Sequence, residues 1–166
     1  MEAKLALAQA AHLKIRAFSF AERSKLMHEA ADLIEAEIDT TSVMLTREMG
    51  KPIAQSRAEV LKCAKSMRYY ADNAESMLSP WNIDDPSKVG ASSAGSIWQP
   101  LGVVLAVMPW NYPLWQVMRF AAPALMAGNA GVLKHASNVP ESAMYLHSLF
   151  TRAGFPEGAF GTLMIS

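Results

Sequence analysis

The sequence has 166 residues, of which 51% are hydrophobic, and its 15 Lys and Arg residues balance its 15 Asp and Glu residues. This length is typical of a single domain with one hydrophobic core. The zero net charge argues against nucleic acid and against an anionic membrane surface as partners. The lone cysteine, Cys63, excludes an internal disulfide and indicates an intracellular protein.

Two further features concern location. Residues 1–11 lack the basic start, apolar stretch and cleavage site of a signal peptide. The most apolar run, residues 101–107, is too short for a membrane-spanning helix, which needs roughly 20 residues. We therefore expect a cytoplasmic protein with no membrane partner.

The first part of the chain, residues 1–80, is rich in Ala, Leu, Met, Glu and Lys and is expected to form a helical segment. Signals for helix starts and ends recur along it: a capping box at Ser19 and Glu22, an N-cap at Asp39, a C-terminal glycine at Gly50 and a helix-starting Pro52. They predict three helices, over residues 20–37, from Asp39 to Gly50, and from Pro52 through Tyr70.

The second part, residues 92–166, alternates short apolar runs with Gly, Pro and Asn. Strands are expected over residues 102–107, 130–133 and 160–165, with helices over residues 113–127 and 140–153 between them. The predicted fold class is α/β: a partial Rossmann-like parallel βαβαβ sheet, preceded by the mostly helical segment, in one partial domain. Residues 92–98 are expected to add a peripheral strand, and residues 84–95 are the linker candidate.

Polar residues follow two of the predicted strands, at residues 108–111 and 134–137. Ligands of an open parallel sheet gather beyond the carboxyl ends of its strands. Lys134 offers a cation, Ser137 a hydroxyl, and the helix that starts at Pro140 a partial positive charge, so the pattern suits a nucleotide. The alternative is that Lys134 is simply solvated.

Asn111 lies between two aromatic residues and just ahead of Pro113, in a turn that is expected to be rigid. A side-chain amide held in this way can stabilise oxyanion charge during acyl chemistry. The alternative is an asparagine that only closes the turn.

Other candidate sites are weaker. His12, His28 and His147 are scattered without carboxylates or cysteines at ligand spacing, so we predict no metal site. A Gly-x-Gly-x-x-Gly phosphate loop does not occur in the sequence. Cys63 lies within a predicted helix and is expected to be buried or inert, although the neighbouring lysines would modestly favour its thiolate.

Three ordered motifs resemble the aldehyde dehydrogenase family. Residues 100–116, PLGVVLAVMPWNYPLWQ, resemble its Pro-Trp-Asn-(Phe/Tyr)-Pro region, and residues 127–134, AGNAGVLK, resemble the segment that follows it. Residues 47–52, REMGKP, with AEV at residues 58–60, resemble its helical Glu-x-Gly-Lys-Pro segment. The resemblance covers nearly the whole chain, and its details are most similar to bacterial succinate-semialdehyde dehydrogenases.

This resemblance implies oxidation of an aldehyde, in which a cysteine thiolate attacks the carbonyl and hydride passes to NADP or NAD. It implies that Asn111 stabilises the oxyanion and that Arg119 binds the carboxylate of succinate semialdehyde. The cofactor-binding residues that it implies are Pro109, Trp110, Asn111, Lys134, His135, Ala136 and Ser137.

Two positions in this set depart from common family patterns. Ser137 stands where many NAD-preferring members carry a glutamate that would repel a 2′-phosphate, so acceptance of NADP is expected. His135 stands where a proline is common, and we interpret it as a backbone neighbour rather than an acid or base.

The resemblance implies that the sequence starts after the family's first strands and stops before its catalytic cysteine, general-base glutamate and oligomerisation strand. The family is homo-oligomeric, but that strand is expected to be missing here, and the isolated chain is expected to be inactive. Two further hypotheses remain: a noncatalytic nucleotide-binding module, and an inactive remnant that associates with a full-length relative.

Overall fold

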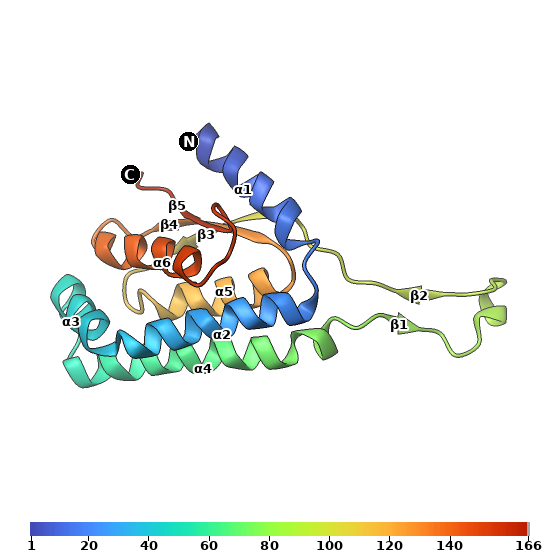
Figure 1. The fold of residues 1–166 in the computed structure, drawn as a ribbon, viewed down its shortest axis with the longest axis horizontal. Helices are drawn as coiled ribbons and strands as arrows, with labels where there is room; N and C mark the ends of the chain where they lie inside the picture. The colour runs from blue at the N-terminus through green and yellow to red at the C-terminus, as the bar shows by residue number, and fades with distance from the viewer. Residues whose placement is uncertain (166) are drawn as a thin grey trace.

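The computed structural model describes residues 1–165 and shows a three-stranded parallel sheet flanked by helices (Figure 1). The elements run in the order α1 (Glu2–Ile15), α2 (Phe20–Ala36), α3 (Ile38–Met49), α4 (Ile53–Met77), β1 (Trp81–Asn82), η1 (Pro86–Val89), β2 (Gly95–Ser96), β3 (Val103–Met108), α5 (Trp115–Met126), β4 (Ala130–His135), α6 (Pro140–Arg152) and β5 (Phe160–Thr162). This confirms the expected helical segment followed by a βαβαβ unit.

The sheet has the order β3-β4-β5, and both neighbouring pairs are parallel, as the sequence predicted. The strand expected over residues 160–165 is shorter than predicted. It ends at Thr162, because the last pairing with β4 joins that residue to Leu133, and the exposed residues Met164 and Ile165 have no strand beside them.

Two helix ends in the first half behave as their residues predicted. At the start of α2, the Ser19 hydroxyl accepts a hydrogen bond from the Glu22 amide at 3.2 Å, while the Glu22 carboxylate accepts one from the Ser19 amide at 2.7 Å. This is the predicted capping box. Gly50 ends α3 in the left-handed conformation, with φ of 73°, which glycine adopts without a steric penalty.

The prediction that Asp39 caps α3 was wrong. The residue before α3 is Glu37, and Asp39 lies inside the first turn of the helix. There its carboxylate pairs with Arg57 of α4, so this side chain joins two helices instead of closing one.

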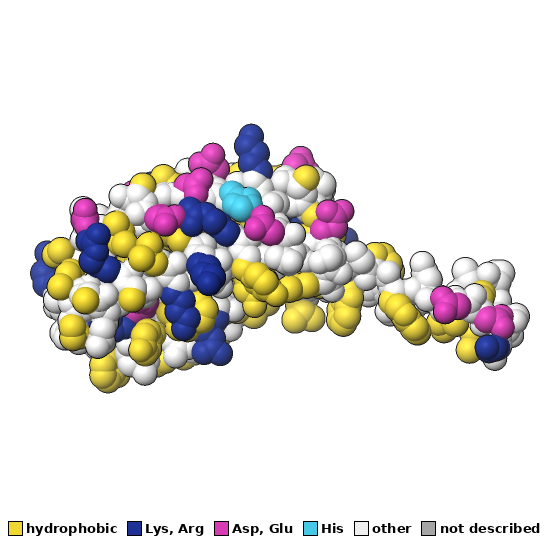
Figure 2. All heavy atoms as spheres, turned by 90° about the horizontal axis from the view of Figure 1, so that it is seen from below, with side chains coloured by type: hydrophobic (Ala, Val, Ile, Leu, Met, Phe, Trp, Pro, Cys, Tyr) yellow, Lys and Arg dark blue, Asp and Glu magenta, His cyan; other side chains and the backbone are white. Residues whose placement is uncertain are grey.

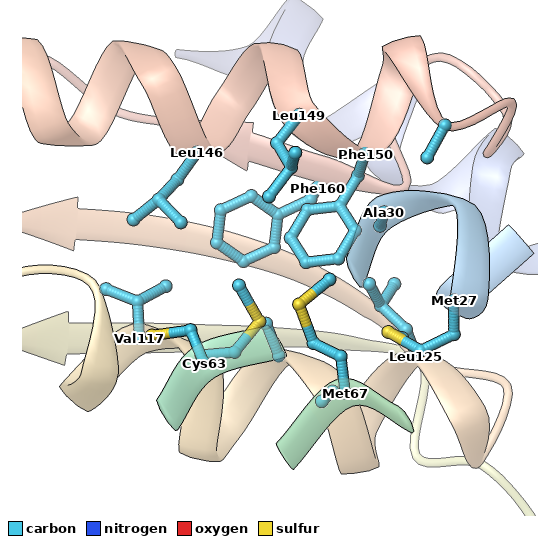
Figure 3. Packing of buried hydrophobic residues seen from close by; sticks show 14 of the residues in the cluster. Met27, Ala30, Cys63, Met67, Val117, Leu125, Leu146, Leu149, Phe150 and Phe160 are labelled. Atoms are coloured by element: carbon cyan, nitrogen blue, oxygen red, sulfur yellow. The ribbon is translucent and has the colours of Figure 1, made fainter. Parts of the chain in front are cut away.

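Helices lie on both faces of the sheet. On one face, Ala8 of α1 packs against Ala130 and Val132 of β4 in a small apolar cluster. On the other face, α5 and α6 pack against the strands, and α2 and α4 pack outside them (Figure 1). Figure 3 shows side chains of α2, α4, α5, α6 and β5 meeting there in the main core. No helix among residues 1–165 has the length and apolar character required to cross a membrane.

A narrow arm projects from the end of α4 (Figures 1 and 2). Its two strands, β1 and β2, pair antiparallel, and the short helix η1 lies between them. The peripheral strand expected within residues 92–98 is therefore present as β2, although it pairs with β1 and not with the main sheet. The linker candidate, residues 84–95, makes up the far end of this arm.

Phe150 of α6 provides a test of the core. Its side chain is fully buried, and its ring lies 5.0 Å from that of Phe160 and 5.7 Å from that of Phe155, measured between centroids. We expect Phe150→Ala to lower the free energy of unfolding by about 3–5 kcal/mol, because it removes buried area and leaves a cavity. Met144→Ala on the exposed side of the same helix is the control, with an expected change within about 0.5 kcal/mol. Urea unfolding of both variants measures the difference, and equal losses would contradict this account of the core.

Candidate functional site

The ends of β3 and β4 lie side by side at one edge of the sheet. Met108, the last residue of β3, pairs in register with His135, the last residue of β4. The segments that follow, residues 109–113 and 136–139, therefore leave the sheet next to each other. This is the arrangement expected from the sequence for residues that face one ligand.

His135 braces the two segments. Its ring is buried, its Nε2 lies 2.8 Å from the Pro113 carbonyl oxygen, and its Nδ1 accepts a hydrogen bond from the Ala136 amide at 2.9 Å. These partners assign the neutral tautomer with the proton on Nε2. Burial lowers the pKa of His135, while its backbone hydrogen bonds act in the opposite direction. The ring therefore belongs to the scaffold, in line with its interpretation as a backbone neighbour.

Glu59 of α4 caps the start of α5. One carboxylate oxygen, Oε1, accepts hydrogen bonds from the amides of Leu114 at 2.9 Å and Trp115 at 3.0 Å. The other oxygen pairs with Lys51, and both side chains are almost fully buried. The Lys51 ammonium also lies 3.8 Å from the centre of the Tyr112 ring, within the range of a cation–π contact. The turn that contains Asn111 is thus anchored to the helical half of the chain.

Glu48 of α3 caps α6 in the same way. Its carboxylate accepts hydrogen bonds from the amides of Glu141 and Ser142 and from the Ser142 hydroxyl. The sequence had suggested that the start of α6 offers partial positive charge to a nucleotide. That prediction was wrong, because a carboxylate of the chain already occupies these amides and offsets their charge.

A groove of about 260 Å³ opens beside the end of β4. Its lining comes from the segment after β4, the start of α6 and the segment after β5: His135, Ala136, Ser137, Pro140, Ala143, Leu163, Met164 and Ile165. The lining is mainly apolar, includes the Ser137 hydroxyl and contains no carboxylate among the residues that the structure describes. Lys134, which precedes His135 in β4, is half-buried.

The remaining candidate residues lie outside this groove, in the segment after β3 and on α5. Trp110, Asn111 and Tyr112 are exposed, and the Asn111 side chain has no hydrogen-bond partner within residues 1–165. Arg119 lies on the exposed side of α5, one turn after Trp115, and forms no ion pair with another described residue. The structure therefore groups residues 135–137 in one groove and leaves Asn111 and Arg119 open to the outside.

Cys63 is fully buried in the core, as expected (Figure 3). Burial raises the pKa of its thiol well above the usual value, and the nearby Glu59 carboxylate raises it further. Lys62 and Lys51 lower the pKa, as expected of neighbouring lysines, but they contribute less than burial and Glu59, so the thiol stays protonated and inert. Residues 1–165 contain no cluster of His, Cys, Asp or Glu that would hold a metal ion.

Sequence reasoning missed Glu48, Lys51 and Glu59 as parts of this edge. Residues 47–52 and 58–60 were noted only as carriers of a family resemblance. A usable signal was present for Glu59, because it lies in α4 beside Val60 and one turn before Cys63, on the apolar stripe of the helix. A glutamate at such a position must find a buried partner.

Comparison with known proteins identifies similar sequences and structures. The sequence model of the aldehyde dehydrogenase family matches residues 1–165. The chain is 63% identical over 148 residues to a succinate-semialdehyde dehydrogenase [NADP(+)] of Mycobacterium ulcerans, covering 89% of this chain and 32% of that protein. It is 55% identical over all 166 residues to a protein of the same description from Mycobacterium bovis, of which it covers 36%.

A solved structure is similar throughout the chain. The succinic semialdehyde dehydrogenase of Streptococcus pyogenes in complex with NADP+ aligns with a TM-score of 0.92 and 34% identity, covering 99% of this chain and 36% of that one. The chain thus spans about a third of the length of these relatives.

His135 makes the stability of the chain depend on pH. Since its pKa is lowered in the folded state, the unfolded state binds more protons below the ordinary value of 6.5. The contribution of His135 to stability is therefore complete above pH 6.5 and is lost as the pH falls through its folded pKa. Urea unfolding at pH 7.5 and pH 5.5 should show a smaller loss for His135→Gln than for the parent chain. Equal losses in the two proteins would argue against titration of this ring.

Proposed function

The chain belongs to the aldehyde dehydrogenase family, and on this premise we propose that it supplies the oxyanion amide and the nucleotide-binding edge of an NADP-using succinate-semialdehyde dehydrogenase. One observation carries the proposal. The pairing of Met108 with His135 brings the Asn111 turn and the groove beside Ser137 to the same edge of the sheet. An aldehyde carbonyl and a nicotinamide must meet at such an edge.

In this proposal Asn111 stabilises negative charge on the aldehyde oxygen. Its side chain is exposed, and the residues that follow it are held by buried partners, so the donor is available while the chain beside it is fixed. When a thiolate adds to the carbonyl, the oxygen becomes anionic and accepts a hydrogen bond from this NH2 group. A comparable amide contributes about 2.7–4 kcal/mol to lowering the barrier.

NADP is the cofactor that the groove beside Ser137 fits. Bound at this edge, the cofactor supplies the acceptor for hydride. The apolar lining suits a nucleoside, and the absence of a carboxylate among the described lining residues leaves room for a 2′-phosphate. Lys134 and the Ser137 hydroxyl would bind the ribose side, and Pro109, Trp110 and the backbone of His135 and Ala136 would line the approach.

Arg119 is the proposed ligand of the substrate carboxylate. It lies eight residues beyond Asn111, on the exposed side of α5, and no described acidic residue neutralises it. A guanidinium in this state can bind a carboxylate through two parallel hydrogen bonds. The substrate class is therefore a short aldehyde with a terminal carboxylate, as in succinate semialdehyde.

Self-association and location belong to the same proposal. The arm carries exposed apolar side chains, including Trp81, Ile97 and Trp98, and two strands alone are marginally stable. A homo-oligomer would cover this surface.

A lone and buried cysteine, Cys63, suits the reducing conditions of the cytoplasm.

A second candidate function is nucleotide binding without catalysis. It is favoured by the groove of about 260 Å³ beside Ser137, which offers an apolar lining and a hydroxyl, while the single cysteine of the sequence, Cys63, is buried away from it. If this candidate is correct, the 166-residue polypeptide binds NADP but shows no turnover.

Ser137 tests the cofactor assignment. In a full-length enzyme in which this chain replaces the matching segment of the Mycobacterium ulcerans relative, Ser137→Glu should lower kcat/KM for NADP relative to NAD. We expect a change of at least about tenfold, which corresponds to about 1.4 kcal/mol, because the new carboxylate repels the 2′-phosphate. Ser137→Ala is the control without added charge. An unchanged ratio of the two kcat/KM values for Ser137→Glu would remove this residue from the cofactor site.

A polypeptide of these 166 residues should not oxidise succinate semialdehyde with either cofactor. Asn111 stabilises only charge that a thiolate has created, and the single cysteine, Cys63, is buried with a raised pKa. Formation of NAD(P)H by the purified chain and by its Cys63→Ala variant is the measurement. Turnover that disappears in Cys63→Ala would refute this assignment, and turnover that persists would point to another mechanism.

A further inference from the structure

A buried ion pair holds the turn that carries Asn111, although neither of its members has a part in the proposed chemistry. The side chains of Lys51 and Glu59 are 5% and 1% exposed and pair with each other at the corner between α3 and α4. Taking two charges out of water is costly, and an apolar pair of the same volume often stabilises a fold as well or better. Stability alone therefore does not explain why charges occupy this place.

The contacts of this pair converge on one short segment. Glu59 accepts the amides of Leu114 and Trp115, and Lys51 lies 3.8 Å from the centre of the Tyr112 ring. The residue between these contacts is Pro113, whose carbonyl oxygen accepts from the His135 ring at 2.8 Å. The four residues after Asn111 are thus held by three buried side chains, Lys51, His135 and Glu59.

Asn111 itself is left out of this network. Its side chain is exposed and bonds to no other residue in the described part of the chain, while buried side chains contact the Tyr112 ring and bond to the backbone of residues 113–115. Such an arrangement fixes the backbone from which the amide projects without occupying its donors. A donor that acts on a developing charge must be held in place in advance, and a misplacement of about 1 Å can cost a hundredfold in rate.

We infer that Lys51 and Glu59 are positioning residues that orient the Asn111 amide, an inference that rests on the proposed function for its consequence in catalysis. Lys51 contacts the Tyr112 ring, and Glu59 binds the amides of Leu114 and Trp115 at the start of α5. Residues 47–52 and 58–60, which include Lys51 and Glu59, thus serve to position the Asn111 turn.

The decisive experiment uses NMR on the 166-residue chain and needs no enzyme activity. The double variant Lys51→Met/Glu59→Gln keeps the side-chain volumes and leaves no unpaired charge. In this variant we expect the Asn111 side-chain amide signals to shift and broaden, and the Leu114 and Trp115 amide protons to exchange at least about tenfold faster than in the parent chain. Amide exchange in the middle of α4 should remain unchanged.

The matched control is Arg68→Met, which removes an exposed charge from the same helix, where Arg68 pairs with Asp32 and Glu35. Its Asn111 signals should match those of the parent. A folded double variant with unchanged Asn111 signals and unchanged exchange overturns the inference. Should the double variant fail to fold, Glu59→Asp keeps both buried charges but shortens the acceptor of the two amides by one methylene, and the same two measurements on it decide the question.

Kinetics extend the test to the consequence for catalysis. In the full-length chimera, the double variant should lose at least about tenfold in kcat with little change in KM for NADP, and Lys51→Arg, which keeps the cation, should retain most of the activity. Unchanged kcat in a folded double variant overturns the positioning role. An inactive parent chimera counts against the proposed function only, and the NMR result on the chain then decides the inference by itself.

Discussion

The Glu59 carboxylate is the contact on which the arrangement of the two halves depends. The first amides of any helix lack partners within the helix and need an acceptor from elsewhere. For α5 that acceptor lies 55 residues earlier in the chain, on α4, and for α6 it is Glu48, more than 90 residues earlier, on α3. The helical half thus completes the hydrogen bonds of the βαβαβ half, which explains why both form one core.

Because Glu59 and Glu48 bind the first amides of α5 and α6, those amides are not available to a ligand at the edge of the sheet. In many dinucleotide-binding folds, the open amides and the dipole of a helix N-terminus bind phosphate. Here the carboxylates Glu48 and Glu59 occupy those positions. Recognition of charge at this edge must therefore come from side chains, and the exposed or half-exposed ones are Lys134, Ser137 and Arg119. The electrostatic character of the site follows from the capping.

Local signals in the sequence predicted most of the fold. The capping box at Ser19 and the glycine at Gly50 fixed helix ends within a residue or two, because such signals act through neighbours in the chain. Contacts between distant segments were not predictable in this way. Asp39 pairs with Arg57 of α4, and Glu59 caps α5, because the packing of the helices brings these distant residues together. The candidate residues at the two strand tips could be named beforehand, but the side chains that hold them could not.

At this edge of the sheet, the residues that hold the structure in place are buried, and the residues proposed to bind a ligand are exposed. His135, Lys51 and Glu59 are buried and satisfied by partners, whereas Asn111 and Arg119 are exposed and unpaired within the described chain. Buried polar groups are costly when one partner is lost, by about 3–5 kcal/mol for a broken ion pair, so they resist rearrangement. The exposed side chains of Asn111 and Arg119 are hydrated when no ligand is present, so their donors remain available to a ligand. A scaffold of this kind keeps the turn at Asn111 fixed while its amide remains able to respond to charge that forms beside it.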